Sequence, residues 1–333
     1  AVGHGSMDAN QTGSLNTAVG YRAMVSNTTA GHNTAVGNDA LYANTTGADN
    51  TAVGSLALDA NTTGAGNTAL GYGTLTSNTT AAYNTAVGYV SMRDNSTGAD
   101  NVAVGFASLI VNTTGQGNTS VGFRSMYANT TASRNTALGY QALKLNTTGP
   151  NNTAVGSNAL YENTTGAYNV AVGANSLDAN IGGHDDTAVG YNVLGANTTG
   201  YSNVGVGGGA AYAAAALATN TTGYGQTGIG AGALASNSTG ALNTAVGRQA
   251  MYASTTGSGN TAVGALALDN NTTAANNTAV GYHALGSVTT TQFNTAVGHT
   301  AGGSLTSGDN TCIGYHAGAY GTGTITSGGA NTI

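Results

Sequence analysis

Side chains that could carry out acid–base or metal chemistry lie side by side at one place in the sequence, His184-Asp185-Asp186. A neighbouring imidazole and carboxylates can hold a metal ion or respond to pH. The cluster follows Asn180-Ile181-Gly182-Gly183, which stands where most other segments of the chain read Asn-Thr-Thr-Gly. A changed turn explains this replacement more simply, so we favour a variant turn and keep a metal or pH-sensitive site as the alternative.

The remaining reactive residue types do not converge in the sequence. The other His residues are His4, His32, His283, His299 and His316, and the acidic residues are mostly single. Cys312 takes a place where comparable segments carry Ala, so we expect a small buried side chain. No Gly-rich loop leads to a Lys as phosphate binding requires. We therefore expect no catalytic, cofactor-binding or metal-binding residues, no cofactor, and no enzyme activity.

The composition excludes several classes of protein. Charged residues make up 5% of the chain, and the formal net charge is −6. Only 6 residues are Lys or Arg, which leaves no basic surface for a nucleic acid. No apolar run is long enough for membrane insertion as a helix. A single Cys excludes a disulfide framework.

The chain is built from one repeated motif. Ala-Val-Gly, or a close variant, recurs every 17 residues from Gly3 to Gly207, and again from Gly230 to Gly298. The intervening step is 23 residues, and a last step of 16 residues reaches Gly314. We expect a single repeat domain over 1–333 with about 19 coils, an insertion within 208–217 and divergent final coils over 299–333.

The residues of each repeat predict short strands joined by turns. Gly, Asn, Thr and Val are poor helix formers, and Asn-Thr-Thr-Gly is typical of turns. The fold class expected is therefore all-β, a parallel β-solenoid of the β-roll or β-helix type with one coil of 17 residues per repeat.

Two columns of apolar residues are candidates for the solenoid core. Leu or Met stands four residues after each motif Gly, and these two exchange at nearly constant volume. We expect an inward stack that includes Met24, Leu41, Leu58, Leu75, Leu143 and Leu160. The motif Val predicts a second inward stack at Val19, Val53 and Val155, with Thr17 on the same side as Val19 and Ala18 facing outward.

Two columns of Asn predict hydrogen-bonded ladders along the coils. One column precedes the strand, at Asn16, Asn33 and Asn50, and the other opens the turn, at Asn27, Asn44 and Asn61. Asn-Thr-Thr also matches the N-glycosylation acceptor pattern, so decoration of these turns is the alternative.

Aromatic residues follow the motif Gly in about half of the coils. Five consecutive coils place them at Tyr72, Tyr89, Phe106, Phe123 and Tyr140. We expect ring stacking or subunit packing along this column, with partner or ligand binding as the alternative.

The segment Asn135–Gly149, NTALGYQALKLNTTG, resembles repeats of phage tail-fibre-type proteins and bacterial surface proteins. Its core, N-T-A-V-G in most coils, also resembles the head repeats of trimeric autotransporter adhesins. This resemblance implies a left-handed parallel β-roll that is usually trimeric.

These observations lead to one expected function and two alternatives. We expect an extracellular structural fibre, a surface filament subunit or an adhesin or tail-fibre shaft, located at a cell or virion surface. Its partner would be itself, as a homo-oligomer or an end-to-end filament, because the sequence begins and ends inside a repeat. One alternative is a module that binds cell-surface glycans through the aromatic column or the insertion around Tyr212. The lesser alternative is ice binding through Thr ladders, against which stands the adjacency of Thr28 and Thr29.

Overall fold

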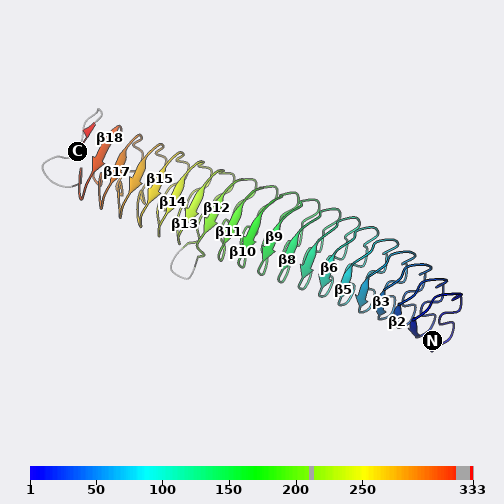
Figure 1. The fold of residues 1–333 in the computed structure, drawn as a ribbon. Coiled ribbons are helices and arrows are strands. Elements are labelled where there is room, and N and C mark those ends of the chain that lie inside the picture. The colour runs from blue at the N-terminus through cyan, green and yellow to red at the C-terminus, as the bar shows by residue number, and fades with distance from the viewer. Residues whose placement is uncertain (210–213, 320–330, 333) are drawn as a thin grey trace. The chain divides into compact units, whose positions relative to one another are not determined.

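The computed structural model describes residues 1–209, 214–319 and 331–332. It confirms an all-β parallel solenoid with one short strand in each coil of about 17 residues (Figure 1). Within these residues we find no helical segment with the length and hydropathy that a bilayer crossing needs.

The chain divides into two compact units, Ala1–Thr165 and Gly166–Ile333. The first contains β1 (Thr17–Val19), β2 (Thr34–Val36), β3 (Thr51–Val53), β4 (Thr68–Leu70), β5 (Thr85–Val87), β6 (Val102–Val104), β7 (Thr119–Val121), β8 (Thr136–Leu138) and β9 (Thr153–Val155). The second contains β10 (Val170–Val172), β11 (Thr187–Val189), β12 (Val204–Val206), β13 (Thr227–Ile229), β14 (Thr244–Val246), β15 (Thr261–Val263), β16 (Thr278–Val280), β17 (Thr295–Val297), β18 (Asn310–Ile313) and β19 (Asn331–Thr332).

Within each unit, every strand pairs in parallel with the next strand along the chain. The register places identical residues opposite one another. Between β1 and β2, Thr pairs with Thr, Ala with Ala and Val with Val. The same pairing continues from β2 to β3. Each residue type therefore forms a straight column across the coils of a unit, and one column shares one environment.

The Leu and Met column lies in the core. Met24, Leu41, Leu58, Leu75, Leu143 and Leu160 are all 0% exposed. The backbone of this column is left-handed, with φ near +53° at both Leu41 and Leu58. An L-residue in that conformation costs about 1–2 kcal/mol, so burial of the side chain has to offset local strain at each Leu or Met of this column. Nothing in the sequence indicated this conformation.

The prediction for the motif Val was wrong. Ala18 is 0% exposed, whereas Val19 is 39% and Val53 38% exposed; Val155 is only partly buried. The alternation along the strand is as expected, with Thr and Val on one side and Ala on the other, but it is Ala that faces inward.

The narrow interior explains why Ala takes the inner side of the strand. At Gly205, which replaces this Ala, an added Cβ would lie 2.5 Å from Val193 Cγ1 and 3.5 Å from Leu194 Cδ1. Val193 itself stands where other coils carry a small residue such as Ala23. A larger side chain opposite is thus compensated by loss of the Ala methyl, and an inward Val would overpack the core.

The motif Gly is required by close approach of successive coils. Gly37 has φ +142°, and a Cβ there would lie 2.5 Å from the Gly54 carbonyl oxygen. The same contact recurs along the column, for example from Gly54 to Gly71. A side chain at this position would separate adjacent coils.

The predicted insertion and the final coils lie partly outside the described residues. On either side of residues 210–213, β12 and β13 keep the standard register, and Leu217 occupies the core column at 0% exposure. Tyr212 is outside the described residues. In the coil after β17, Gly302 replaces the core Leu. Leu305 is 3% exposed, and its Cδ1 lies 3.2 Å from the place where a Cβ added at Gly302 would be. The divergent coil is therefore repacked, and β17 and β18 stay in register. Residues 320–330 and 333 of the divergent coils are not described.

Candidate functional site

The two Asn columns form ladders inside the solenoid. Asn44 Nδ2 donates to Asn27 Oδ1 at 3.1 Å and to the Gly47 carbonyl at 2.9 Å. Asn61 repeats the pattern to Asn44 at 2.9 Å. In the other column, Asn33 N donates to Asn16 Oδ1 and Asn50 N to Asn33 Oδ1, each at 2.9 Å.

Burial of these Asn residues bears on the glycosylation alternative. Asn27, Asn33, Asn44, Asn50 and Asn61 are all 0% exposed, and Asn16 is partly buried. The Nδ2 atom that would carry a sugar donates two hydrogen bonds at Asn44 and Asn61. A glycan on these atoms is incompatible with the ladder.

The five aromatic residues predicted as a column form a continuous stack. Neighbouring ring centroids are 5.3, 5.5, 5.3 and 5.4 Å apart from Tyr72 to Tyr140, with planes tilted by no more than 14°. The rings remain between 39% and 52% exposed. Each inner ring has both faces covered by its neighbours, so it presents only its edge to solvent. Tyr72 and Tyr140 end the stack, next to the small residues Ser55 and Ser157.

Basic side chains accompany the aromatic residues. Arg124 lies over the Phe123 ring at 5.3 Å and the Tyr127 ring at 5.4 Å. Lys144 Nζ donates to Tyr161 Oη at 2.7 Å and lies over the same ring. These contacts are cation–π pairs that hold Arg124 and Lys144 against the surface.

Further ring stacks in the second unit were missed by sequence reasoning. His184, Tyr201 and Tyr224 stack with centroids 5.0 Å apart. Tyr282, His299 and Tyr315 form another stack at 5.1 and 5.4 Å. The first three residues each stand six positions before a motif Gly, and the second three each directly follow one, so these fixed positions could have revealed both stacks.

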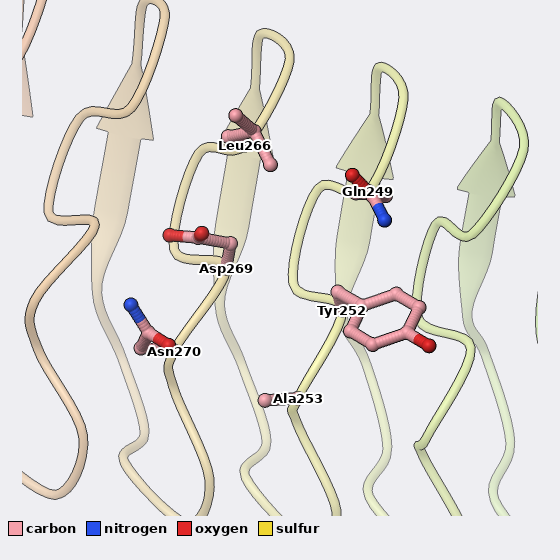
Figure 2. A pocket seen from close by; sticks show the side chains of 6 residues that line it. All are labelled: Gln249, Tyr252, Ala253, Leu266, Asp269 and Asn270. Carbon is pink, nitrogen blue, oxygen red and sulfur yellow. The ribbon is translucent and has the colours of Figure 1, made fainter. Parts of the chain in front are cut away.

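A hollow of about 360 Å³ in the second unit is lined by side chains from two adjacent coils (Figure 2). The lining residues are Gln249, Tyr252, Ala253, Leu266, Asp269 and Asn270. Burial raises the pKa of the Asp269 carboxyl, and the charge of His283, 3.7 Å away, opposes that shift. Asp269 Oδ1, the atom that faces His283, is buried and has no hydrogen-bond partner among the described residues.

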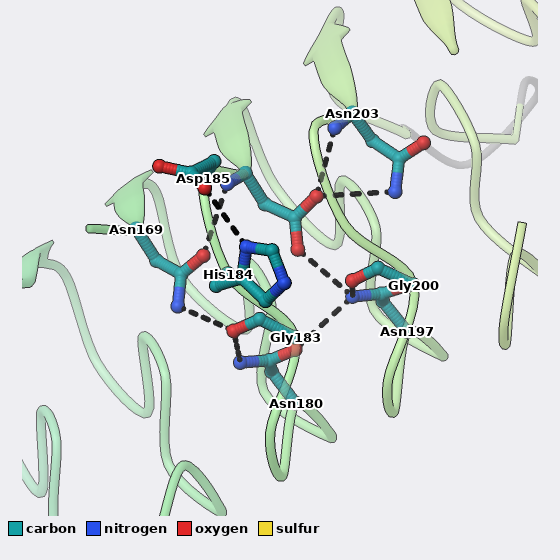
Figure 3. A network of polar contacts seen from close by, with 9 residues as sticks. Asn169, Asn180, Gly183, His184, Asp185, Asn197, Gly200 and Asn203 are labelled. Atoms are coloured by element: carbon teal, nitrogen blue, oxygen red, sulfur yellow. Dashed lines mark hydrogen bonds and ion pairs between the residues drawn. The ribbon is translucent and has the colours of Figure 1, made fainter. Parts of the chain in front are cut away.

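The candidate cluster at His184 separates into exposed and buried parts. His184 Nδ1 and Asp185 Oδ2 are 2.8 Å apart at the surface, with both side chains about half exposed. Figure 3 shows this pair beside the Asn residues of the ladder. Asp186, by contrast, is 0% exposed and replaces Asn within the ladder.

Asp186 accepts on Oδ1 the hydrogen bonds that a ladder Asn accepts there, and its Oδ2 accepts one more in the place of the donating amide. Its Oδ1 takes hydrogen bonds from Asn203 N at 2.9 Å and Asn203 Nδ2 at 3.1 Å, and its Oδ2 takes one from Asn197 Nδ2 at 3.1 Å. Burial raises the pKa of this carboxyl to about 7, although the bonds from Asn203 and the charge of His184 lower it. The position combines a structural role with titration near neutral pH.

Other potentially reactive groups are enclosed. Ser120 Oγ is hydrogen-bonded to Ser108 Oγ at 2.7 Å and to Ser125 Oγ at 2.8 Å, and all three residues are 0% exposed. Cys312 is also buried, and burial raises the pKa of its thiol. Across the described ranges, no three His, Cys, Asp or Glu side chains are placed to hold a metal ion together.

The chain matches no protein-family model and no curated protein. The structure supports a repetitive β-solenoid with Asn ladders.

Proposed function

We propose that this chain is an extracellular structural fibre, a solenoid segment that serves as the shaft of a surface filament, adhesin or tail fibre. The observation that carries the proposal is the stacking of near-identical coils through backbone pairing and buried Asn ladders together. At Asn44, for example, the side-chain bond to Asn27 and the pairing of β2 with β3 join successive coils, and the bond to the Gly47 carbonyl holds the turn within the coil.

This arrangement suits a mechanical role. Backbone hydrogen bonds between coils are reinforced by Asn bonds inside the core, where water does not compete for them. The chain also has only 6 Lys and Arg residues, which leaves trypsin few cleavage sites. Stacking of coils from separate chains would extend the same ladder, since an unpaired strand edge is a template for another strand.

Protease resistance and electron microscopy test the proposal. We expect the native chain to survive trypsin that digests the denatured chain, and micrographs at rising concentration to show filaments or rods. Asn44→Ala should speed digestion of the native chain, because it removes ladder bonds from a buried site. Asn38→Ala, at an exposed position of the same coil, is the matched control and should not. Rapid digestion of the native chain, or globular particles at all concentrations, would contradict a fibre.

A second candidate function is binding of surface glycans by the aromatic stack. It is favoured by the exposure of all five rings from Tyr72 to Tyr140. Sugars pack on ring faces, and only the two end rings have a face free of another ring of the stack. We expect Tyr72→Ala and Tyr140→Ala to weaken binding on a glycan array more than Phe106→Ala does. Equal binding by all three variants and the unmodified chain would rule out this site.

A further inference from the structure

The outward side of the strands in the first unit is unusually uniform for an exposed surface. In β1–β9 its first column is Thr except for Val102, and its second column is Val except for Leu70 and Leu138. The column directly after the motif Gly is also exposed, yet it contains Tyr, Asn, Ser and Phe. Exposure alone therefore does not keep a column uniform in this chain.

Strand propensity does not account for this uniformity. Tyr and Phe favour strands as much as Val and Thr do. The chain contains 17 Tyr and 3 Phe, but none of them stands in a strand of the first unit. Only short, β-branched or aliphatic side chains occupy the outward positions, so the surface they form is flat.

The strand hydroxyl groups of this surface make no hydrogen bond to another described residue, in contrast to those of the turn. In the turn, Thr45 Oγ1 donates to the Thr62 carbonyl and Thr62 Oγ1 to the Thr79 carbonyl. The strand residues Thr51 and Thr68 have no side-chain hydrogen bond to any part of the chain that the structure describes. Their hydroxyls remain free to bond to something outside the protein.

The surface is also uncharged. No acidic or basic residue occurs in β1–β9. The charged residues of the first unit lie elsewhere, as in the Arg22–Asp39 pair at 2.8 Å. A neutral surface complements a neutral partner and gives no attraction to a charged one.

The columns fix two spacings at once. Neighbouring strands are about 4.8 Å apart, and alternate residues on one strand about 6.6 Å apart. Nine in-register strands therefore present rows of hydroxyl and methyl groups over an area on the order of 40 by 10 Å. A partner that engages every row must itself repeat, be uncharged and form hydrogen bonds, and crystalline water meets all three conditions.

We propose that this surface, the Thr/Val face of β1–β9, binds ice. Thr hydroxyls would join the hydrogen-bonded lattice, and Val methyls would fill the spaces between lattice oxygens. The Thr residues involved are those of the strands, which face outward, and not the adjacent pair in the turn. Ice binding by this face does not require the fibre function.

Thermal hysteresis of the full chain tests the proposal, together with two matched variants. Thr68→Lys places an ammonium group in the middle of the face, whereas Thr63→Lys makes the same change at an exposed turn position of the preceding coil. We expect the unmodified chain to depress the freezing point below the melting point. Thr68→Lys should reduce this effect by about half or more, since it divides a contiguous surface, and Thr63→Lys should leave it unchanged.

Val53→Lys, at an exposed position of the same face, serves as a second variant if Thr68→Lys does not fold. Circular dichroism identifies variants that keep the native fold. Absence of hysteresis in the unmodified chain overturns the proposal, as does an equal loss in Thr63→Lys. If hysteresis is absent and Thr68→Lys alone converts an oligomer to a monomer in sedimentation, the face binds a second copy of the chain instead of ice.

Discussion

The coil that begins at Asn50 and the coil that begins at Asp186 differ by one atom type at the same ladder position. Asn50 N donates to Asn33 Oδ1 at 2.9 Å, and its Nδ2 donates to the Gly64 carbonyl at 2.8 Å. Asp186 N makes the equivalent bond to Asn169 Oδ1 at 3.0 Å, but its side chain has a second oxygen in place of the amide nitrogen.

The difference shows what the ladder demands of its members. Each position needs one acceptor for the next coil and one donor for a turn carbonyl of its own coil. An ionised Asp supplies only acceptors, whereas a protonated Asp supplies both. Burial shifts Asp186 toward the protonated form and raises its pKa to about 7. The regular ladder is therefore insensitive to pH, and the ladder at Asp186 is not.

The largest expected change in stability comes from placing a carboxyl at an Asn ladder position of the first unit. Asn50→Asp should lower the free energy of unfolding at pH 8 by roughly 4 kcal/mol, because a carboxyl pKa raised by about 3 units is worth that much. At pH 4 the loss should be small, because the carboxyl then carries its proton. Denaturant unfolding at both pH values measures this, and an equal loss at both would show that shape rather than charge is the cause.

Asp186→Asn should have a smaller effect of opposite sign, an increase in the free energy of unfolding at pH 8. The unfolded chain releases this proton near pH 3.8 and the folded chain near pH 7, so the folded chain binds more protons between these values. Stability of the unmodified chain should therefore fall as pH rises from about 4 to above 7. Asp186→Asn should remove that slope and raise stability at pH 8 by about 2 kcal/mol. This gain is smaller than the roughly 4 kcal/mol above because Asp186 Oδ2 accepts a hydrogen bond from Asn197 Nδ2 that an amide nitrogen in its place cannot accept.

A gain that is the same at pH 5 and pH 8 would contradict titration of Asp186. The control is Asp185→Asn, which alters the exposed neighbour of Asp186 and leaves the ladder intact. It should preserve the downward slope.

The smallest effect is expected from His184→Gln. A charged His184 lowers the pKa of Asp186, so its removal should move the midpoint of the stability decline slightly upward. Because His184 is half exposed, solvent screens most of its influence. Following the Asp186 carboxyl by NMR measures the shift, and a downward movement would show that His184 acts through something other than its charge.

Much of the fold followed from the sequence because the repeats act as aligned copies of one coil. The 17-residue step, the Leu column at residues such as Leu41, and the Asn ladders at Asn33 and Asn44 were all predicted and are all present. Stacking of Tyr72 to Tyr140 was also predicted, since one position in consecutive coils must lie on one line.

Other features could not be predicted from single columns. The left-handed backbone at Leu41 is not indicated by its residue type, because Leu disfavours it. The titrating group at His184-Asp185-Asp186 could be located in the sequence, but which carboxyl is buried depended on the alternation of inward and outward positions.

The sequence by itself determined which residues share a column and therefore which side chains stack along each unit. Only the tertiary structure decided which side of the strand faces the interior. A pattern that alternates with period two is equally consistent with either side inward, and Thr-Ala-Val reads as apolar on both. The choice is made by the width of the solenoid, which has room for the methyl of Ala18 beside the Leu column and none for the larger Val19.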